Sequence, residues 1–216
     1  MLGLYLTHPE VTIDPSTPVT DWSLNAAGLA RVQGFAARPW LAAFRRIIAS
    51  PERKAQETAA VLARAFGMPV ETAEAMGEND RSATGYLPGP QFEAAADAFF
   101  AHPDTSYQGW ETARAAQSRV VAALGALLSG HDLSAPLIFV GHGAVGTLLR
   151  QAMAGEPISR MGDQRPGGGC LFGFGLPFGP VQGGWQRMED VTSAPPEFAQ
   201  LLALGPRSAF GETGKF

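Results

Sequence analysis

The sequence predicts an α/β fold in which helices cover both faces of a mostly parallel central sheet. Short apolar runs alternate with longer segments of helical periodicity, and this alternation is typical of βαβ units. The chain has 216 residues, of which 45% are hydrophobic, enough for one domain with a full core. Two of the apolar runs end in a histidine, His8 and His142. In such folds the carboxyl ends of the strands form the ligand crevice, so we expect both histidines to face one bound group.

The individual elements follow from the spacing of apolar residues. Leu29, Val32 and Phe35, for example, recur at the spacing of one helix face. We predict helices over residues 25–37, 50–66, 111–128 and 144–153. The shorter apolar runs between them predict strands at residues 2–6, 46–49, 68–71, 137–140 and 170–174.

Residues 74–109 break this alternation, because a stretch rich in glycine and proline precedes a short amphipathic helix at about 92–100. Long segments within compact domains often serve as functional lids. We therefore expect a single domain over residues 1–216 with a lid-like insertion at 74–109. From about Ser193 the chain is rich in Pro, Gly and Ala, and we expect its end to be disordered.

The composition argues against several classes of partner. The net charge is -4, and the Lys and Arg residues are scattered, so we expect no nucleic acid. No stretch approaches the roughly 20 apolar residues of a membrane-spanning helix, so we expect no membrane. The first residues run straight into a predicted strand without a basic leader, and we expect a cytoplasmic protein. Nothing in the sequence predicts the oligomeric state.

A second informative segment spans residues 49–59, at the start of a predicted helix. Ser50 is a favourable N-cap residue, and the free N–H groups of a helix start favour an anion. Helical spacing places Arg53 on a polar stripe with Glu57 and turns Lys54 toward the inside. In the alternative interpretation, both cations are solvated surface charges.

The order of these segments resembles the histidine phosphatase superfamily, whose fold is phosphoglycerate-mutase-like. That family has Arg-His-Gly after the first strand, a Ser-x-x-x-Arg-Ala-x-x-Thr-Ala helix, a glutamate after the third strand and a later Gly-His pair. The matching segments here are Thr7-His8-Pro9, Ser50 to Ala59, Glu78 and Gly141-His142. The resemblance covers about residues 1–174 and implies a three-layer α/β/α architecture.

The resemblance also implies a two-step phosphoryl transfer. His8 would attack phosphorus and form a phosphohistidine that water then cleaves. Glu78 would protonate the leaving oxygen and then activate water, with Glu74 and Asp80 as alternatives in the same loop. His142 would donate to the phosphoryl oxygens. The residues expected to bind phosphate are Thr7, Ser50, Arg53, Lys54, Arg81 and Gly143.

Three residues depart from the family pattern. Thr7 and Lys54 stand where the family has arginines, and lysine cannot make the bidentate contact of a guanidinium. Pro9 replaces glycine and has no N–H to offer phosphate. Each lost charge-assisted hydrogen bond costs about 1.5–3 kcal/mol, or roughly ten- to hundredfold in binding or rate. Arg81 is a candidate replacement cation, although a loop arginine is more often solvated.

The sequence thus predicts a phosphomonoesterase for a small phosphorylated substrate, with inorganic phosphate as its product. An imidazole nucleophile requires no metal or other cofactor. A phosphoglycerate mutase is a weaker second, because Arg81 is the only Lys or Arg in residues 74–109 to bind a substrate carboxylate. The alternative from another class is a catalytically weakened or inactive member of the fold that binds phosphate or a phosphoprotein.

Overall fold

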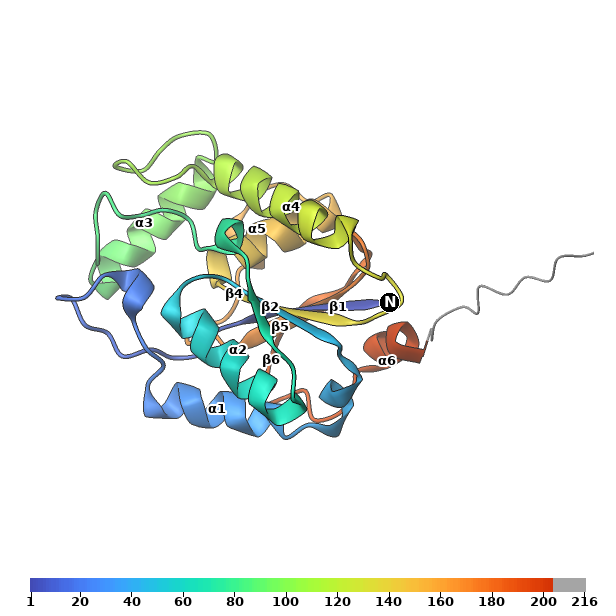
Figure 1. Cartoon of the computed structure of the whole chain (residues 1–216). Coiled ribbons are helices and arrows are strands. Elements are labelled where there is room, and N and C mark those ends of the chain that lie inside the picture. Colours follow the sequence, from blue (N-terminus) through green and yellow to red (C-terminus); the bar gives the residue numbers. More distant parts are fainter. Residues whose placement is uncertain (204–216) are drawn as a thin grey trace, which may run out of the picture.

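A computed structural model describes residues 1–203, and one six-stranded sheet lies at their centre (Figure 1). Its strands are β1 (Leu2–Thr7), β2 (Arg46–Ala49), β3 (Val70–Thr72), β4 (Leu137–Gly141), β5 (Cys170–Gly175) and β6 (Val181–Arg187). Their order is β3-β2-β4-β1-β5-β6. The pairs β1/β4, β2/β4 and β2/β3 are parallel, whereas β5 runs antiparallel to both β1 and β6. The predicted mostly parallel sheet is confirmed.

Helices cover both faces of this sheet (Figure 1). The α-helices are α1 (Ala26–Ala36), α2 (Arg53–Phe66), α3 (Gly89–Ala101), α4 (Ala113–Ser129), α5 (Gly143–Ala154) and α6 (Pro196–Ala203). Alternate side chains of a strand point to opposite faces. Accordingly Leu4 and Leu6 pack in the core under α1 and α2, while Tyr5 packs in the core under α4 and α5. The three-layer α/β/α architecture is therefore confirmed.

The start of α2 differs from the prediction in a way that matters for the site. Ser50 is not the N-cap: the cap position is Glu52, whose side chain makes no capping bond. The Ser50 hydroxyl instead accepts a hydrogen bond from the Glu52 N–H at 3.2 Å. Residues 50–52 thus form a short extended turn before the helix, and this turn carries two buried polar side chains, Ser50 and Glu52, into the interior.

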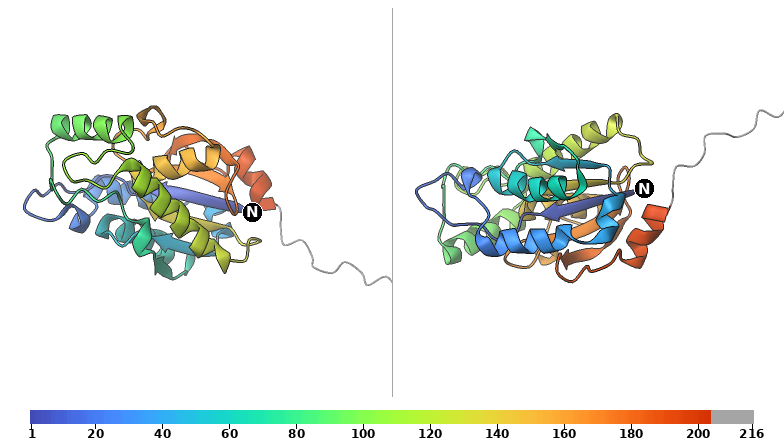
Figure 2. Two further views of the ribbon diagram at one scale, coloured as in Figure 1. Left: turned by 90° about the horizontal axis from the view of Figure 1, so that it is seen from above. Right: turned by 60° about the horizontal axis from the view of Figure 1, so that its bottom comes forward.

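The insertion lies beyond the ends of the parallel strands, where α3 and the loop before it project from the sheet (Figure 2). Its helix is longer than the predicted 92–100 and begins at Gly89. Within residues 1–203, the strand β6 and the α-helix α6 were not predicted, nor were the short 3-10 helices. The sequence of β6, Val-Gln-Gly-Gly-Trp-Gln-Arg, has two glycines and no apolar alternation, and α6 begins in the proline-rich stretch. The predicted disorder of the C-terminal end falls on residues 204–216, outside the described residues.

Within residues 1–203, no helix is both long and apolar enough to cross a membrane.

Candidate active site

Three predicted site residues follow directly after three neighbouring parallel strands. His8 comes after β1, Ser50 after β2 and His142 after β4. Main-chain bonds extend the sheet into these positions, from the His8 N–H to Gly141 at 3.0 Å and from the Ser50 N–H to Val140 at 3.0 Å. The carboxyl ends of the strands therefore bring these side chains together, as expected for a ligand site of an α/β sheet.

His8 is held in one tautomer by its own neighbour. Its Nδ1 lies 2.8 Å from the Pro9 carbonyl oxygen, which can only accept, so Nδ1 carries the proton and Nε2 keeps its lone pair. Burial, together with the positive charge of Lys54, lowers the pKa of His8 to about 4. The imidazole is therefore neutral near pH 7. Pro9 has no N–H for phosphate, but its carbonyl oxygen orients the histidine.

A glycine turn completes the backbone around His8. The Gly169 N–H donates to the His8 carbonyl oxygen at 3.0 Å. Gly168 has a φ of +58°, and a Cβ there would lie 2.2 Å from the same oxygen. Only glycine permits both this backbone conformation and this close approach.

His142 is fully buried, and its ring meets that of His8 edge to face at 5.2 Å between centroids. Its Nε2 lies 2.6 Å from the Ser50 hydroxyl oxygen, while its Nδ1 has no partner among the described residues. The Ser50 hydroxyl can donate its proton to Nε2 while its oxygen accepts from the Glu52 N–H. Burial holds the pKa of His142 well below its usual range, and in the tautomer in which Ser50 donates, the neutral ring carries its proton on Nδ1.

Tyr5 fixes the backbone of His142, a role that the sequence did not indicate. Its hydroxyl accepts from the His142 N–H and donates to the His142 carbonyl oxygen, both at 3.2 Å. A Cβ on Gly141 would lie 2.3 Å from this hydroxyl oxygen. The glycine of the Gly-His pair therefore makes room for the tyrosine.

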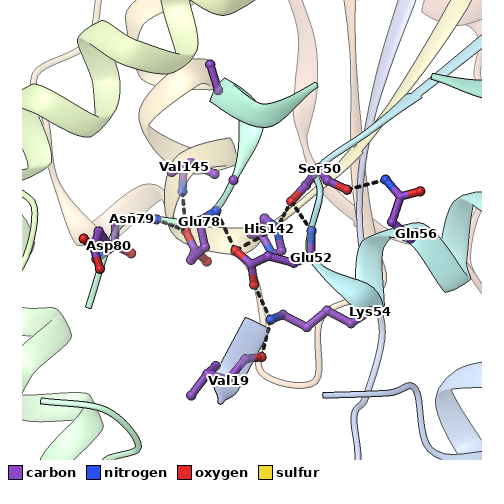
Figure 3. A network of polar contacts seen from close by, with 12 residues as sticks. Val19, Ser50, Glu52, Lys54, Gln56, Glu78, Asn79, Asp80, His142 and Val145 are labelled. Carbon is purple, nitrogen blue, oxygen red and sulfur yellow. Dashed lines mark hydrogen bonds and ion pairs between the residues drawn. The ribbon is translucent and has the colours of Figure 1, made fainter. Parts of the chain in front are cut away.

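Glu78 lies at the start of α5. Its Oε1 accepts from the N–H groups of Asn79 and Val145, both at 3.2 Å (Figure 3). Burial raises the pKa of Glu78, although Arg81 opposes the shift. The two alternative acids do not share this position: Glu74 is exposed, and Asp80 is exposed with its carboxylate bound to Ser82. Of the three, only Glu78 lines a cavity together with His8.

Lys54 points inward, as predicted, but it does not face the site as a free cation. Its ammonium group binds the Glu52 carboxylate and donates to the Val19 carbonyl oxygen at 2.8 Å (Figure 3). Arg53, by contrast, is 59% exposed and pairs with Glu57 at 2.9 Å. The inclusion of Arg53 among the phosphate-binding residues is therefore corrected, because the turn of the helix directs it to solvent.

Where the family pattern has its first arginine, Thr7 binds a neutral side chain. The Thr7 hydroxyl donates to the Gln164 side-chain oxygen at 2.7 Å and accepts from the Cys170 N–H at 2.9 Å. The amide nitrogen of Gln164 packs against Gly143, where a Cβ would lie only 2.3 Å from it. Gln164 thus adds an amide donor beside the start of α5. No sequence signal pointed to it, since it lies in a loop 157 positions from Thr7.

Two cavities meet at His8. One, of about 560 Å³, is walled mainly by apolar side chains of the loop after β1 and of the insertion. The other, of about 510 Å³, contains Glu78 and the first residues of α5. His8, Arg81 and Gln164 line both. Arg81 is half-buried, with its guanidinium carbon 5.0 Å from the ring centroid of Phe92, and it forms no ion pair within residues 1–203.

The described part of the chain contains no group of three His, Cys, Asp or Glu side chains placed to hold a metal ion.

The family model described as histidine phosphatase superfamily (branch 1) matches residues 12–171. The fold is similar to that of a mycobacterial glucosyl-3-phosphoglycerate phosphatase solved with inorganic phosphate, with 17% identity over 87% of this chain and 98% of that chain and a TM-score of 0.71. It is similar also to YhfR of Bacillus stearothermophilus, with 17% identity over 84% of this chain and 94% of that chain and a TM-score of 0.70. No curated protein matches the chain.

Proposed function

The chain belongs to branch 1 of the histidine phosphatase superfamily, and on this premise we propose that it is a phosphomonoesterase whose nucleophile is His8. The observation that carries the proposal is the tautomer of His8. Its Nδ1 proton is bound to the Pro9 carbonyl oxygen, so the lone pair of Nε2 is left for attack in a ring that lines both cavities. A neutral, oriented imidazole is what nucleophilic catalysis requires.

The reaction has two balanced steps. Nε2 of His8 forms a bond to phosphorus while the bond to the ester oxygen breaks, and Glu78 gives its proton to that oxygen. Water then attacks the phosphohistidine, Glu78 takes a proton from the water, and the bond from His8 to phosphorus breaks to release phosphate. The raised pKa of Glu78 supports its role as an acid, since a useful general acid holds its proton near the working pH.

Donors around the phosphoryl group come from three places. Nδ1 of His142 has no partner within residues 1–203 and is a buried donor when Ser50 donates to Nε2; a buried donor without a partner is costly unless a ligand binds it. The Gln164 amide and the start of α5 add neutral donors, and Arg81 is the cation from the insertion. A similar mycobacterial phosphatase has been solved with inorganic phosphate and with VO3, which supports a phosphate-sized ligand here.

The apolar cavity supports an apolar alcohol as the rest of the substrate. Trp22 and Tyr86 meet in its wall at 5.6 Å between ring centroids, and Ile13, Leu87 and Phe92 add further apolar surface. A cavity of about 560 Å³ is within the usual range for small-molecule sites. We therefore expect aryl phosphates to be better substrates than sugar phosphates.

A second candidate, a phosphate binder with little turnover, is favoured by one specific observation. The two arginines of the family pattern are replaced by Thr7, which binds a neutral glutamine, and by Lys54, whose charge is balanced by Glu52. The transition state of phosphoryl transfer depends on such positive groups for much of its stabilisation.

The experiment compares wild type, His8→Ala and the control His102→Ala, which removes an exposed histidine, on aryl and sugar phosphates. We expect His8→Ala to lower kcat/KM by about a thousandfold or more, and His102→Ala to leave it unchanged. Equal activity in wild type and His8→Ala would refute the nucleophile. A quench without acid traps phosphohistidine at His8 if the protein is an enzyme, whereas phosphate binding without this adduct identifies the binder.

A further inference from the structure

We propose that Glu52 is a specificity-determining residue of this site: it is a built-in counter-ion to Lys54 and makes the site select a phosphomonoester with one negative charge over one with two. The proposal rests on the phosphoryl-binding function above, and it applies equally to an enzyme and to a binder. Nothing in the family pattern quoted above specifies a carboxylate at this position.

The ion pair itself is the first observation. The Lys54 and Glu52 side chains are 3% and 9% exposed, so the pair is shielded from water. One further donor of the Lys54 ammonium is taken by the Val19 carbonyl oxygen. Separating a buried pair leaves an uncompensated charge, which is strongly unfavourable. The positive charge of Lys54 is therefore balanced before any phosphate arrives.

The second observation is how Glu52 is held next to the catalytic groups. Its Oε1 accepts from the Glu78 N–H at 2.9 Å and lies 3.4 Å from Nε2 of His142. Glu52, Glu78 and Arg81 also line one cavity of about 440 Å³, next to the cavity that Glu78 shares with His8. The carboxylate is thus close enough to act on a phosphoryl group through its charge.

The remaining charges facing Glu52 can be counted. His8 after β1 and His142 after β4 are neutral near pH 7, because burial lowers the pKa of both. Burial alone would raise the pKa of Glu52, but the Lys54 ammonium and the hydrogen bond from the Glu78 N–H hold it below its usual range, so this carboxylate stays ionised. Glu78, whose pKa is raised by burial, adds no positive charge in either form.

Two cations outside the pair line the cavities around His8 without forming an ion pair within residues 1–203. They are Arg81, which is half-buried, and Arg165, which is exposed. Water and salt screen the charge of an exposed arginine. Two further carboxyl groups, those of Glu78 and Asp163, line the cavity that contains His8, and burial raises the pKa of both. With these two groups protonated, the site is left with about one net positive charge, that of Arg81; each of them would subtract one charge when ionised.

This charge matches one ionisation state of the ligand. A phosphomonoester carries one negative charge below its second pKa, about 6, and two above it. Because Coulomb energy scales with the product of charges, an ionised Glu52 opposes the dianion about twice as strongly as the monoanion. Without the Glu52 carboxylate, the positive charge of Lys54 would be available to attract the ligand. The binding free energy of the dianion would then improve more than that of the monoanion.

The test compares wild type with Glu52→Gln, which keeps an oxygen for the Glu78 N–H. We use inorganic phosphate as the probe and measure Kd by calorimetry at about pH 5 and about pH 8, where monoanion and dianion dominate. We expect Glu52→Gln to bind phosphate about tenfold more tightly or better at the higher pH, and about threefold more tightly at the lower pH, the square root of that factor.

The matched control is the double variant Glu52→Gln/Lys54→Met, which removes both charges and should bind phosphate as weakly as wild type. If Glu52→Gln does not fold without ligand, Glu52→Met and the rise in Tm on adding phosphate provide the same comparison. A folded Glu52→Gln with wild-type affinity at about pH 8, or a double variant that keeps the gain, would overturn the proposal. The Kd measurement does not depend on turnover. It therefore still tests the role of Glu52 if His8→Ala and wild type prove equally active.

Discussion

The Ser50 hydroxyl oxygen lies 2.6 Å from Nε2 of His142, although the two residues are 92 positions apart. The bond joins the end of β2 to the end of β4, and when the Ser50 hydroxyl donates in it, the other ring nitrogen of His142 is the donor. Catalysis by preorganised donors depends on such orientation, because the donor must already point at the place where charge develops.

Replacing this hydroxyl tests the orientation of His142. We expect Ser50→Ala to lower kcat about tenfold, the value of one hydrogen bond of about 1.4 kcal/mol, with little change in KM. Nitrogen NMR shifts of His142 should report mixed tautomers. Ser129→Ala, which removes a hydroxyl bound to its own helix, should change neither readout. An unaltered tautomer in Ser50→Ala would contradict the positioning role.

The contribution of Arg81, the cation of the insertion, to ligand binding can be distinguished from that of the exposed Arg165. Arg81→Gln should raise KM for phosphomonoesters about ten- to hundredfold, because a charge-assisted hydrogen bond is worth about 1.5–3 kcal/mol. Arg165 lines the same cavity but is exposed, so Arg165→Gln should raise KM much less. Steady-state kinetics of both variants test this difference in KM. Equal effects would contradict the proposal that Arg81 binds the phosphoryl group.

The proposed role of Glu78 predicts a specific pH dependence of turnover. Because its pKa is raised, Glu78 keeps its proton to a higher pH than an ordinary glutamate, and kcat/KM should fall as the pH rises through that raised pKa. Glu78→Gln should lower kcat by about a hundredfold or more and abolish this limb of the profile. Retention of the same limb in the variant would assign it to another group.

The pH dependence of the free energy of unfolding should also reflect the lowered pKa of His8. Its pKa is about 4 when folded, against 6.5 for an ordinary histidine, so the unfolded chain binds more protons between these values. The contribution of His8 to the free energy of unfolding is therefore fully present above about pH 6.5 and is lost as the pH falls toward 4. Urea unfolding of His8→Asn should show a shallower loss than wild type across this window. Identical slopes would mean that the histidine is not desolvated.

Much of the fold could be predicted because its signals are local. The apolar run of residues 2–6 and the helical spacing of Val32 and Phe35 depend on residues a few positions apart. The sheet order and β6 could not be read in this way. The pairing of β1 with β4 joins segments far apart in sequence, and the glycines of β6 hide its alternation.

For the site, the sequence by itself determined which residues end the strands: His8, Ser50 and His142, together with a nearby Glu78. Only the tertiary structure decided which charges are free. Lys54 and Arg53 are adjacent in the sequence, yet one is buried against Glu52 and the other is exposed to solvent. The worth of a charge depends on its burial and on its nearest partners, and both are set by three-dimensional packing rather than by residue type.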